Sequence, residues 1–261
     1  MPAAVSSHKV RDVTVRMMRQ GSGPPLLYLH GANGLPPWLP MLETLSRQFE
    51  VIVPEHPGFG LSDNPPWIRN VGDLAMYYLD FIEALSPHPV NLVGLSLGGW
   101  VAAEVAVRNC TRLATLSLLA PAGLRVKGVP MGDNFIWDGE ESVRNLYHDQ
   151  SLADRLLAQA QSMTDDDADL ALTNRFAAAK FGWEPRWFNP GLERWLHRIS
   201  VRTLIVWGDD DKLFPAAYAA RWGERIPGSR VEIIPDCGHG IALEKPDAAA
   251  KEIMRLIAGM R

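Results

Sequence analysis

A single serine stands between glycines in the stretch Gly94-Leu95-Ser96-Leu97-Gly98. The residues before it form an apolar run typical of a buried strand, and the residues after it read as a helix. A serine at so sharp a strand-to-helix turn has a strained backbone and a projecting side chain. Glycines two positions away on either side relieve the crowding there. The pattern therefore predicts an exposed nucleophile.

A serine hydroxyl needs a base to become a good nucleophile, and the base needs an acid to orient it. Asp209, Asp210 and Asp211 follow one strand-like run, and His239 follows the next. Carboxyl ends of parallel strands meet at one edge of a sheet, so these side chains are expected beside Ser96. Catalytic triads are known in which the serine comes first in the sequence, then the acid, then the histidine. At this point all three aspartates remain candidates for the acid.

Short, nearly continuous apolar runs alternate with amphipathic segments along the chain. Such runs are typical of strands covered on both faces. The polar/apolar alternation of residues 9–23 predicts an antiparallel edge strand that ends in a glycine turn. Together they predict an α/β fold with a mostly parallel, doubly wound sheet of about eight strands. The runs are 24–31, 49–57, 90–96, 113–121, 201–209 and 229–236, and the expected helices include 71–85, 97–109 and 215–226.

Residues 125–198 break this alternation, because they lack strand-like runs and are rich in tryptophan. We interpret them as a helical insertion, or lid, in a core built from residues 1–124 and 199–261. Most of its aromatic residues are expected to pack within the lid, with a minority reaching a substrate. The candidates for substrate contact are Trp137, Trp183 and Trp187.

The acidic run at 164–170 does not predict a metal site. Leu170 stands where a calcium loop needs glycine, and Phe176 stands where it needs the closing glutamate. Acidic residues in the first turn of a helix, favoured by its dipole, explain the run more simply. The sequence also lacks a phosphate-binding loop and a dinucleotide fingerprint, so no metal or organic cofactor is expected.

The composition favours a small-molecule substrate over a large charged partner. The 261 residues carry a net charge of -4 and show neither a basic stripe nor a basic tail, which disfavours nucleic acid and anionic membranes. No run approaches 18 apolar residues, and the N-terminal residues lack the apolar core of a secretory signal. Cys110 and Cys237 lack metal-ligand spacing. A cytoplasmic location is therefore the expectation.

Four segments besides the serine turn resemble motifs of the α/β-hydrolase fold family, and the resemblance covers nearly the whole chain. They are LLYLHGANG (26–34), VIVPEHPGFGLSD (51–63), WGDDDKLFP (207–215) and CGHGIALEKP (237–246). The match implies Asp211 as the acid, by its distance from the preceding glycine and the following proline. Asp209 and Asp210 remain alternatives, with a solvated loop position as their expected role. Glu55 stands where many members have aspartate, and we attach no catalytic consequence to it.

The resemblance implies acyl transfer through a covalent intermediate on Ser96. His239 would take the serine proton, and Asp211 would fix the tautomer of the imidazole. The backbone N–H groups of Ala32 and Leu97 would stabilise the oxyanion. Asn33 is a second candidate in the same loop, through its backbone or its side-chain amide. The first hypothesis is a hydrolase of a small to medium, fairly apolar carboxylic ester, with neither metal nor cofactor.

Two other functions stay open. Some relatives hydrolyse a carbon-carbon bond in ring-cleavage products with the same triad. They tend to have Gly-Pro-Gly in the oxyanion loop and an aromatic residue after the histidine, where this chain has Asn33-Gly34-Leu35 and Gly240. A ligand receptor that keeps the fold without useful turnover is the third possibility. Relatives with an aspartate nucleophile are disfavoured by Ser96, and the oligomeric state is left open.

Overall fold

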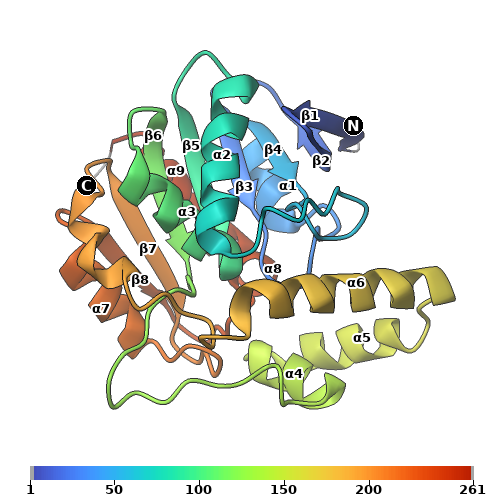
Figure 1. Cartoon of the computed structure of the whole chain (residues 1–261). Helices are drawn as coiled ribbons and strands as arrows, with labels where there is room; N and C mark the ends of the chain where they lie inside the picture. The colour runs from blue at the N-terminus through green and yellow to red at the C-terminus, as the bar shows by residue number, and fades with distance from the viewer. Residues whose placement is uncertain (1–2, 260–261) are drawn as a thin grey trace.

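The computed structural model describes residues 3–259, and eight strands form one sheet in the order β1-β2-β4-β3-β5-β6-β7-β8 (Figure 1). β2 pairs antiparallel with both β1 and β4, and all other neighbours are parallel. The predicted α/β fold with a mostly parallel sheet is confirmed. The strands are β1 (Ala4–Val10), β2 (Val13–Gln20), β3 (Pro25–Leu29), β4 (Glu50–Pro54), β5 (Val90–Leu95), β6 (Leu113–Leu119), β7 (Thr203–Gly208) and β8 (Arg230–Ile234).

The antiparallel strand expected within residues 9–23 forms as β2 and ends just before Gly21, but its expected place at the edge of the sheet is wrong, because β1 lies outside it. β1 and β2 pair as a hairpin whose turn includes Arg11 at φ 52°. β1 is the edge of the sheet, and most of its residues are exposed whether their side chains are polar or apolar. A strand that buries neither face has no periodic pattern to reveal it.

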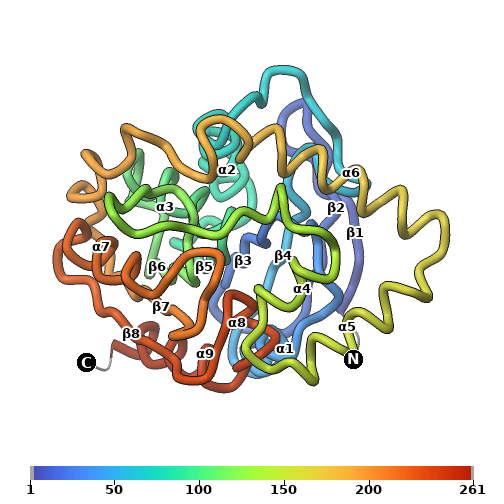
Figure 2. Tube along the Cα trace, turned by 90° about the horizontal axis from the view of Figure 1, so that it is seen from below, coloured from blue at the N-terminus to red at the C-terminus, as the bar shows by residue number. Residues whose placement is uncertain are grey.

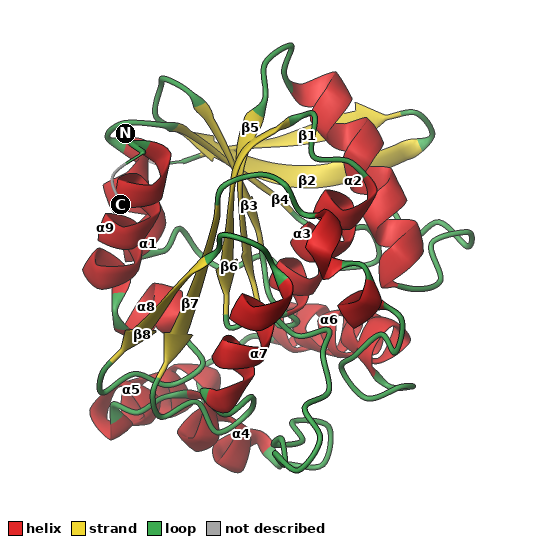
Figure 3. Ribbon diagram, turned by 90° about the vertical axis from the view of Figure 1, so that its left-hand side faces the viewer, coloured by secondary structure: helices red, strands yellow, loops and turns green. Residues whose placement is uncertain are grey.

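Helices cover both faces of the sheet, as a parallel sheet requires. Figure 3 shows α1 and α9 on one face and α2, α3 and α7 on the other. The strands between them supply a continuous apolar core, with Leu26, Leu27, Leu92 and Val206 fully buried. The helices of these layers are α1 (Pro40–Ser46), α2 (Val71–Leu85), α3 (Leu97–Arg108), α7 (Ala217–Arg225), α8 (Ile241–Glu244) and α9 (Pro246–Ile257).

The chain between β6 and β7 carries three more α-helices, which lie beyond the carboxyl ends of the parallel strands (Figures 1 and 2). They fall within residues 125–198. Among the described residues of this segment, Phe188 alone takes part in β pairing, through an isolated bridge to Gly123. The acidic run lies in the first turn of α6, where Thr164 and Asp167 form a capping box. The helices are α4 (Gly139–Leu146), α5 (Gln150–Ala160) and α6 (Asp165–Gly182), followed by two short 3-10 turns, Leu192–Arg194 and Leu196–Arg198.

Residues 3–259 contain no helix that combines the length and the hydropathy needed to cross a bilayer.

Candidate active site

Ser96 occupies the turn between β5 and α3 with φ 54° and ψ −115°, a backbone conformation that side chains rarely adopt. The strand and the helix approach too closely for larger residues around it. A Cβ atom at Gly94 would overlap the backbone of Gly98, and one at Gly98 would overlap the carbonyl of Leu29. The two glycines therefore permit the turn that holds Ser96.

Hydrogen bonds from three sides fix the strained backbone of Ser96. Its N–H donates to the carbonyl of Leu119 at 2.9 Å, in the neighbouring strand β6. Its carbonyl accepts from the N–H groups of Trp100 at 3.0 Å and Ala122 at 3.1 Å. The conformation persists because α3 and the end of β6 both determine it.

His239 and Asp211 form a buried pair. Nδ1 of His239 lies 2.7 Å from Oδ2 of Asp211, and the other carboxylate oxygen accepts from the backbone N–H groups of Leu213 and Phe214, both at 2.9 Å. A neutral imidazole that donates from Nδ1 keeps its lone pair on Nε2. Nε2 of His239 is buried and has no hydrogen-bond partner among the described residues. This nitrogen is therefore free to accept a proton.

The structure brings Asp211 to His239 and places the two alternative aspartates elsewhere. Asp210 is 41% exposed in its side chain and lies 2.9 Å from Nδ1 of His148. Asp209 accepts a hydrogen bond at 3.2 Å from the backbone N–H of Cys237. Both are thus engaged away from the imidazole of His239.

The loop after β3 holds Ala32 in a tight turn beside Ser96. A Cβ atom on Gly31 would lie 3.5 Å from Cβ of Ser96. The carbonyl of Gly31 lies 3.3 Å from the N–H of Gly34, which donates to it, and 2.7 Å from Nδ1 of His30. In a trans peptide the carbonyl and the N–H point in opposite directions, so the N–H of Ala32 points away from these bonds. It is available as a donor.

Leu97 offers a second donor next to the serine. It begins α3, and the first N–H groups of a helix have no intrahelical acceptor. The helix dipole also favours negative charge at this end. The two candidate donors thus lie close to Ser96, Leu97 directly after it at the start of α3 and Ala32 in the turn packed beside it.

Two buried histidines anchor the Ala32 loop to the core. The N–H of His56 donates to Nε2 of His30 at 3.0 Å, which places the proton of His30 on Nδ1. His56 Nε2 lies 2.9 Å from the carbonyl of His30, and His56 Nδ1 lies 2.6 Å from the hydroxyl of Tyr78. Burial lowers the pKa of His56 to about 4 and holds the pKa of His30 well below its usual value. Both rings are therefore neutral and structural.

Ser96 and His239 line one cavity of about 460 Å³, together with Ala32 and Asn33. None of the described residues that line it is a lysine, arginine, aspartate or glutamate. Its walls come from the segment 35–40 after the Ala32 turn, from α8 and its neighbours, and from the α4–α5 corner. The residues contributed by that corner and by α5 are Leu146, Tyr147, Leu156 and Gln159.

The three tryptophans expected near the substrate are not among the residues that line this cavity. Trp187 is buried against Phe135, with ring centroids 5.0 Å apart. Trp183 is 53% exposed and lies under the guanidinium of Arg186. Trp137 is half-buried and packs against the hydrophobic core.

Two aromatic residues that sequence reasoning missed, Trp38 and Tyr147, line the cavity instead. The proline-rich run 35–40, directly after the Ala32 turn, was the available signal for Trp38. Tyr147 packs so closely on Gly240 that a Cβ atom there would overlap its ring. This contact joins the inserted segment to the His239 loop. The sequence around Tyr147 contains no pattern that predicts it.

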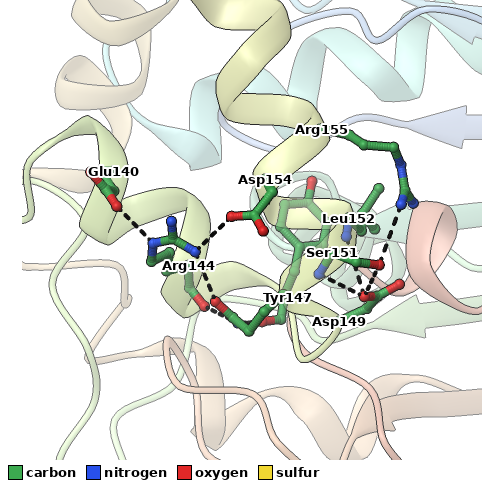
Figure 4. A network of polar contacts seen from close by, with 9 residues as sticks. Glu140, Arg144, Tyr147, Asp149, Ser151, Leu152, Asp154 and Arg155 are labelled. Carbon is green, nitrogen blue, oxygen red and sulfur yellow. Dashed lines mark hydrogen bonds and ion pairs between the residues drawn. The ribbon is translucent and has the colours of Figure 1, made fainter.

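A polar network holds the corner that carries Tyr147 (Figure 4). Asp149 caps α5 by accepting from the N–H groups of Ser151 at 2.9 Å and Leu152 at 3.2 Å. Arg144 joins α4 to α5 through its ion pair with Asp154 at 3.1 Å. Because both helix ends are fixed, the corner is a defined wall of the cavity.

The corner also binds the His239 loop. One carboxylate oxygen of Glu244 accepts from the N–H of Asp149 at 2.5 Å, and the other accepts from the N–H of Gly238 at 2.6 Å. The N–H of Gly240 donates to the carbonyl of Leu146 at 3.1 Å. The segment between β6 and β7 is thus hydrogen-bonded to the loop that positions the imidazole.

Comparisons with known proteins agree on one family. The model of the alpha/beta hydrolase fold family matches residues 24–246. The dihydrolipoyllysine-residue acetyltransferase component of the acetoin cleaving system of Cupriavidus necator is 30% identical over 93% of this chain, and the match covers 66% of that protein. The chain thus spans slightly less than two thirds of that relative's length.

A second curated relative and a solved structure match over most of their own lengths. The 2-hydroxy-6-oxo-2,4-heptadienoate hydrolase of Pseudomonas putida is 27% identical over 86% of this chain and 86% of that protein. The crystal structure of a serine hydrolase involved in carbazole degradation superposes with a TM-score of 0.77 at 23% identity, over 98% of this chain and 99% of the other. The chain therefore belongs to the α/β-hydrolase fold family.

Proposed function

We propose that this α/β-hydrolase cleaves a small to medium, fairly apolar carboxylic ester through an acyl-enzyme on Ser96. One observation carries the proposal. Nδ1 of His239 lies 2.7 Å from Oδ2 of Asp211, and Nε2 of the same ring has no hydrogen-bond partner among the described residues. His239 and Ser96 line the same cavity. A nucleophile, a base and an orienting acid in this arrangement support acyl transfer.

In the first half of the reaction, Oγ of Ser96 attacks the ester carbonyl carbon while its proton passes to Nε2 of His239. Asp211 stays ionised and stabilises the imidazolium. The negative charge on the carbonyl oxygen is met by the N–H groups of Ala32 and Leu97, and removing one such donor typically costs about 3 kcal/mol of transition-state stabilisation. When the intermediate collapses, the carbon–oxygen bond breaks and His239 gives its proton to the departing alcohol.

In the second half, water attacks the acyl carbon and gives a proton to His239. The second tetrahedral intermediate expels Oγ of Ser96, which recovers its proton from the imidazole, and a carboxylic acid leaves. The chain's own residues perform each of these steps.

The cavity wall favours an uncharged acyl group. The described cavity-lining residues include no Lys, Arg, Asp or Glu that could pair with a carboxylate or an ammonium group. Moving such a charged group from water into the cavity is therefore unfavourable. A volume of about 460 Å³ lies within the range of sites for small organic molecules. We infer that residues 125–198 act as a lid, since α4, α5 and the corner between them supply Leu146, Leu156 and Tyr147 to the wall.

Carbon-carbon bond hydrolysis is the second candidate, favoured by the similarity to the heptadienoate hydrolase of Pseudomonas putida. The substrate in that relative's name carries a carboxylate, and none of the described cavity-lining residues of this chain is a lysine or arginine. The charge of the cavity therefore argues for the ester.

Turnover of p-nitrophenyl acetate, butyrate and octanoate tests the proposal, with 2-hydroxy-6-oxo-2,4-heptadienoate as the competing substrate. We expect a burst and steady turnover of the shorter esters. Ser96→Ala should abolish both, whereas Ser162→Ala, at an exposed serine, should retain them. Higher kcat/KM for the dienoate than for every ester would transfer the assignment to carbon-carbon hydrolysis. Saturable binding of the esters without product would indicate a receptor.

A further inference from the structure

Asn174 stands out on α6, because it is the one polar residue that this helix buries, with 9% of its surface exposed. Its side-chain amide lies between two loops that are remote from it in sequence. Nδ2 donates to the carbonyl of Asn33 at 3.1 Å, and Oδ1 accepts from the N–H of Gly60 at 2.9 Å. The opposite orientation of the amide would set like groups against each other, so both contacts fix the same assignment.

The contact with Asn33 falls within the turn that holds Ala32. Gly34 adopts φ +90°, and a Cβ atom there would overlap the amide of Asn174. The turn is therefore packed directly against the Asn174 side chain, as well as bonded to it. On its other side the same turn is held by Nδ1 of His30, which lies 2.7 Å from the carbonyl of Gly31.

The second contact gives Asn174 a fixed support. Gly60 belongs to a loop in which the N–H of Leu61 donates to Glu55 at 2.8 Å. Glu55 is buried and forms an ion pair with Arg16 at 3.1 Å, in strand β2. The amide of Asn174 thus links the Ala32 turn to a loop anchored in the sheet.

We propose that Asn174 is a positioning residue that sets the direction of the Ala32 N–H by holding the carbonyl of Asn33. The inference rests on the proposed function, in which that N–H binds the oxyanion. Two braces act on the turn, His30 from the core and Asn174 from α6. The Ala32 N–H binds the oxyanion only in the transition state, and the strength of that hydrogen bond depends on the direction of the N–H. Loss of one brace therefore lowers kcat more than it raises KM.

Asn174→Asp isolates the brace. At neutral pH its carboxylate still accepts from the N–H of Gly60 but cannot donate to the carbonyl of Asn33 and repels it. We expect kcat for p-nitrophenyl butyrate to fall by roughly 10-fold or more, within the loss seen when an oxyanion donor is removed, with KM changed less than about 3-fold. Affinity for a trifluoromethyl ketone, which forms an oxyanion adduct with the serine, should fall by the same factor as kcat.

Acid should rescue this variant. A protonated carboxyl group both donates and accepts, so the ratio of variant to wild-type kcat should rise as pH is lowered. Thr173→Ala, at an exposed neighbour on the same helix, is the matched control and should keep wild-type values. A variant with wild-type kcat and ketone affinity would overturn the inference, and so would a kcat ratio that stays flat with pH.

Hydrogen–deuterium exchange gives a readout independent of turnover. The peptide that spans residues 30–39 should exchange faster in Asn174→Asp and Asn174→Ala than in the wild type, and Thr173→Ala should match the wild type. Equal exchange in all four proteins would overturn the brace even if no ester were a substrate. An active wild type whose Asn174 variants keep full kcat would refute this inference and leave the proposed function intact. If Asn174→Ala does not fold, Asn174→Asp carries the test.

Discussion

Asp211 holds His239 with one carboxylate oxygen and is itself held by the other: Oδ2 lies 2.7 Å from Nδ1 of the imidazole, and Oδ1 accepts two backbone N–H groups at 2.9 Å. The carboxylate is buried, and each of its oxygens has a partner. Its orientation is therefore fixed before any substrate arrives, and so is the tautomer of the histidine.

Asp211→Asn should reduce kcat by a factor on the order of 10⁴, because an amide in this position favours the wrong imidazole tautomer. Steady-state kinetics with p-nitrophenyl butyrate measures the loss. Asp210→Asn is the control and should change kcat little, since Asp210 pairs with His148. An equal or larger loss in Asp210→Asn would contradict the assignment of the acid.

Acid should destabilise the protein through His56. Burial lowers its pKa to about 4 in the folded state, whereas an unfolded histidine titrates near 6.5. The unfolded chain thus binds more protons between these values, and the free energy of unfolding falls as pH drops through that window, by about 3 kcal/mol for His56 alone. Urea unfolding at pH 7, 6, 5 and 4.5 measures the slope.

His56→Gln removes that titration and should make the dependence of stability on pH below 6.5 shallower, with buried His30 still contributing a slope of the same sign, although the variant loses stability at pH 7. His88→Gln, at an exposed histidine, is the control and should keep the wild-type slope. If His56→Gln and the wild type lost stability in parallel, His56 would not be the buried neutral group described here.

His148 has the opposite effect on stability. A hydrogen bond to Asp210, with the nearby charges of Asp236 and Glu244, raises the pKa of His148. A raised folded-state pKa contributes stability that is fully present below about pH 6.5 and is lost as pH rises through the folded pKa. The melting temperature of His148→Ala should therefore lie below that of the wild type at pH 6 and approach it by pH 9. A gap that is constant with pH would contradict the ion pair.

Tyr147→Ala should change which esters the enzyme prefers. Removing a ring from the cavity wall enlarges the space for an acyl chain, so kcat/KM for octanoate relative to acetate should rise by about 10-fold, the lower end of the range for a small change in the size of a hydrophobic pocket. Trp183→Ala, at an exposed aromatic residue of the same segment, should leave the ratio unchanged. A shift in Trp183→Ala alone would place the acyl group outside this cavity.

Backbone constraints explain why much of the fold and the serine turn were predictable. Buried strands such as Val90–Leu95 are apolar on both faces, which gives a continuous run in the sequence. Gly94 and Gly98 are required by close backbone contacts, so the turn leaves a local signature. β1 has no such signature in the sequence, because most of its residues are exposed and show no alternation between buried and exposed positions.

Contacts between distant segments explain what sequence reasoning missed. Asn174 is hydrogen-bonded to Asn33, which lies 141 positions away in the sequence, and Tyr147 packs on Gly240. The residues next to Asn174 and Tyr147 in the sequence therefore give no sign of these contacts. Trp137, Trp183 and Trp187 do not line the cavity, because an aromatic residue packs as readily within α-helical layers as against a ligand. Trp187 is stacked on Phe135 and buried there.

The most direct test of the account is the mass of the protein after reaction with a fluorophosphonate, followed by peptide mapping. We predict one adduct on the peptide that contains Ser96, formed in the wild type and in Ser162→Ala and absent from Ser96→Ala. An adduct on another residue, or an unmodified wild type, would contradict the claim that Ser96, His239 and Asp211 act together as a nucleophilic site.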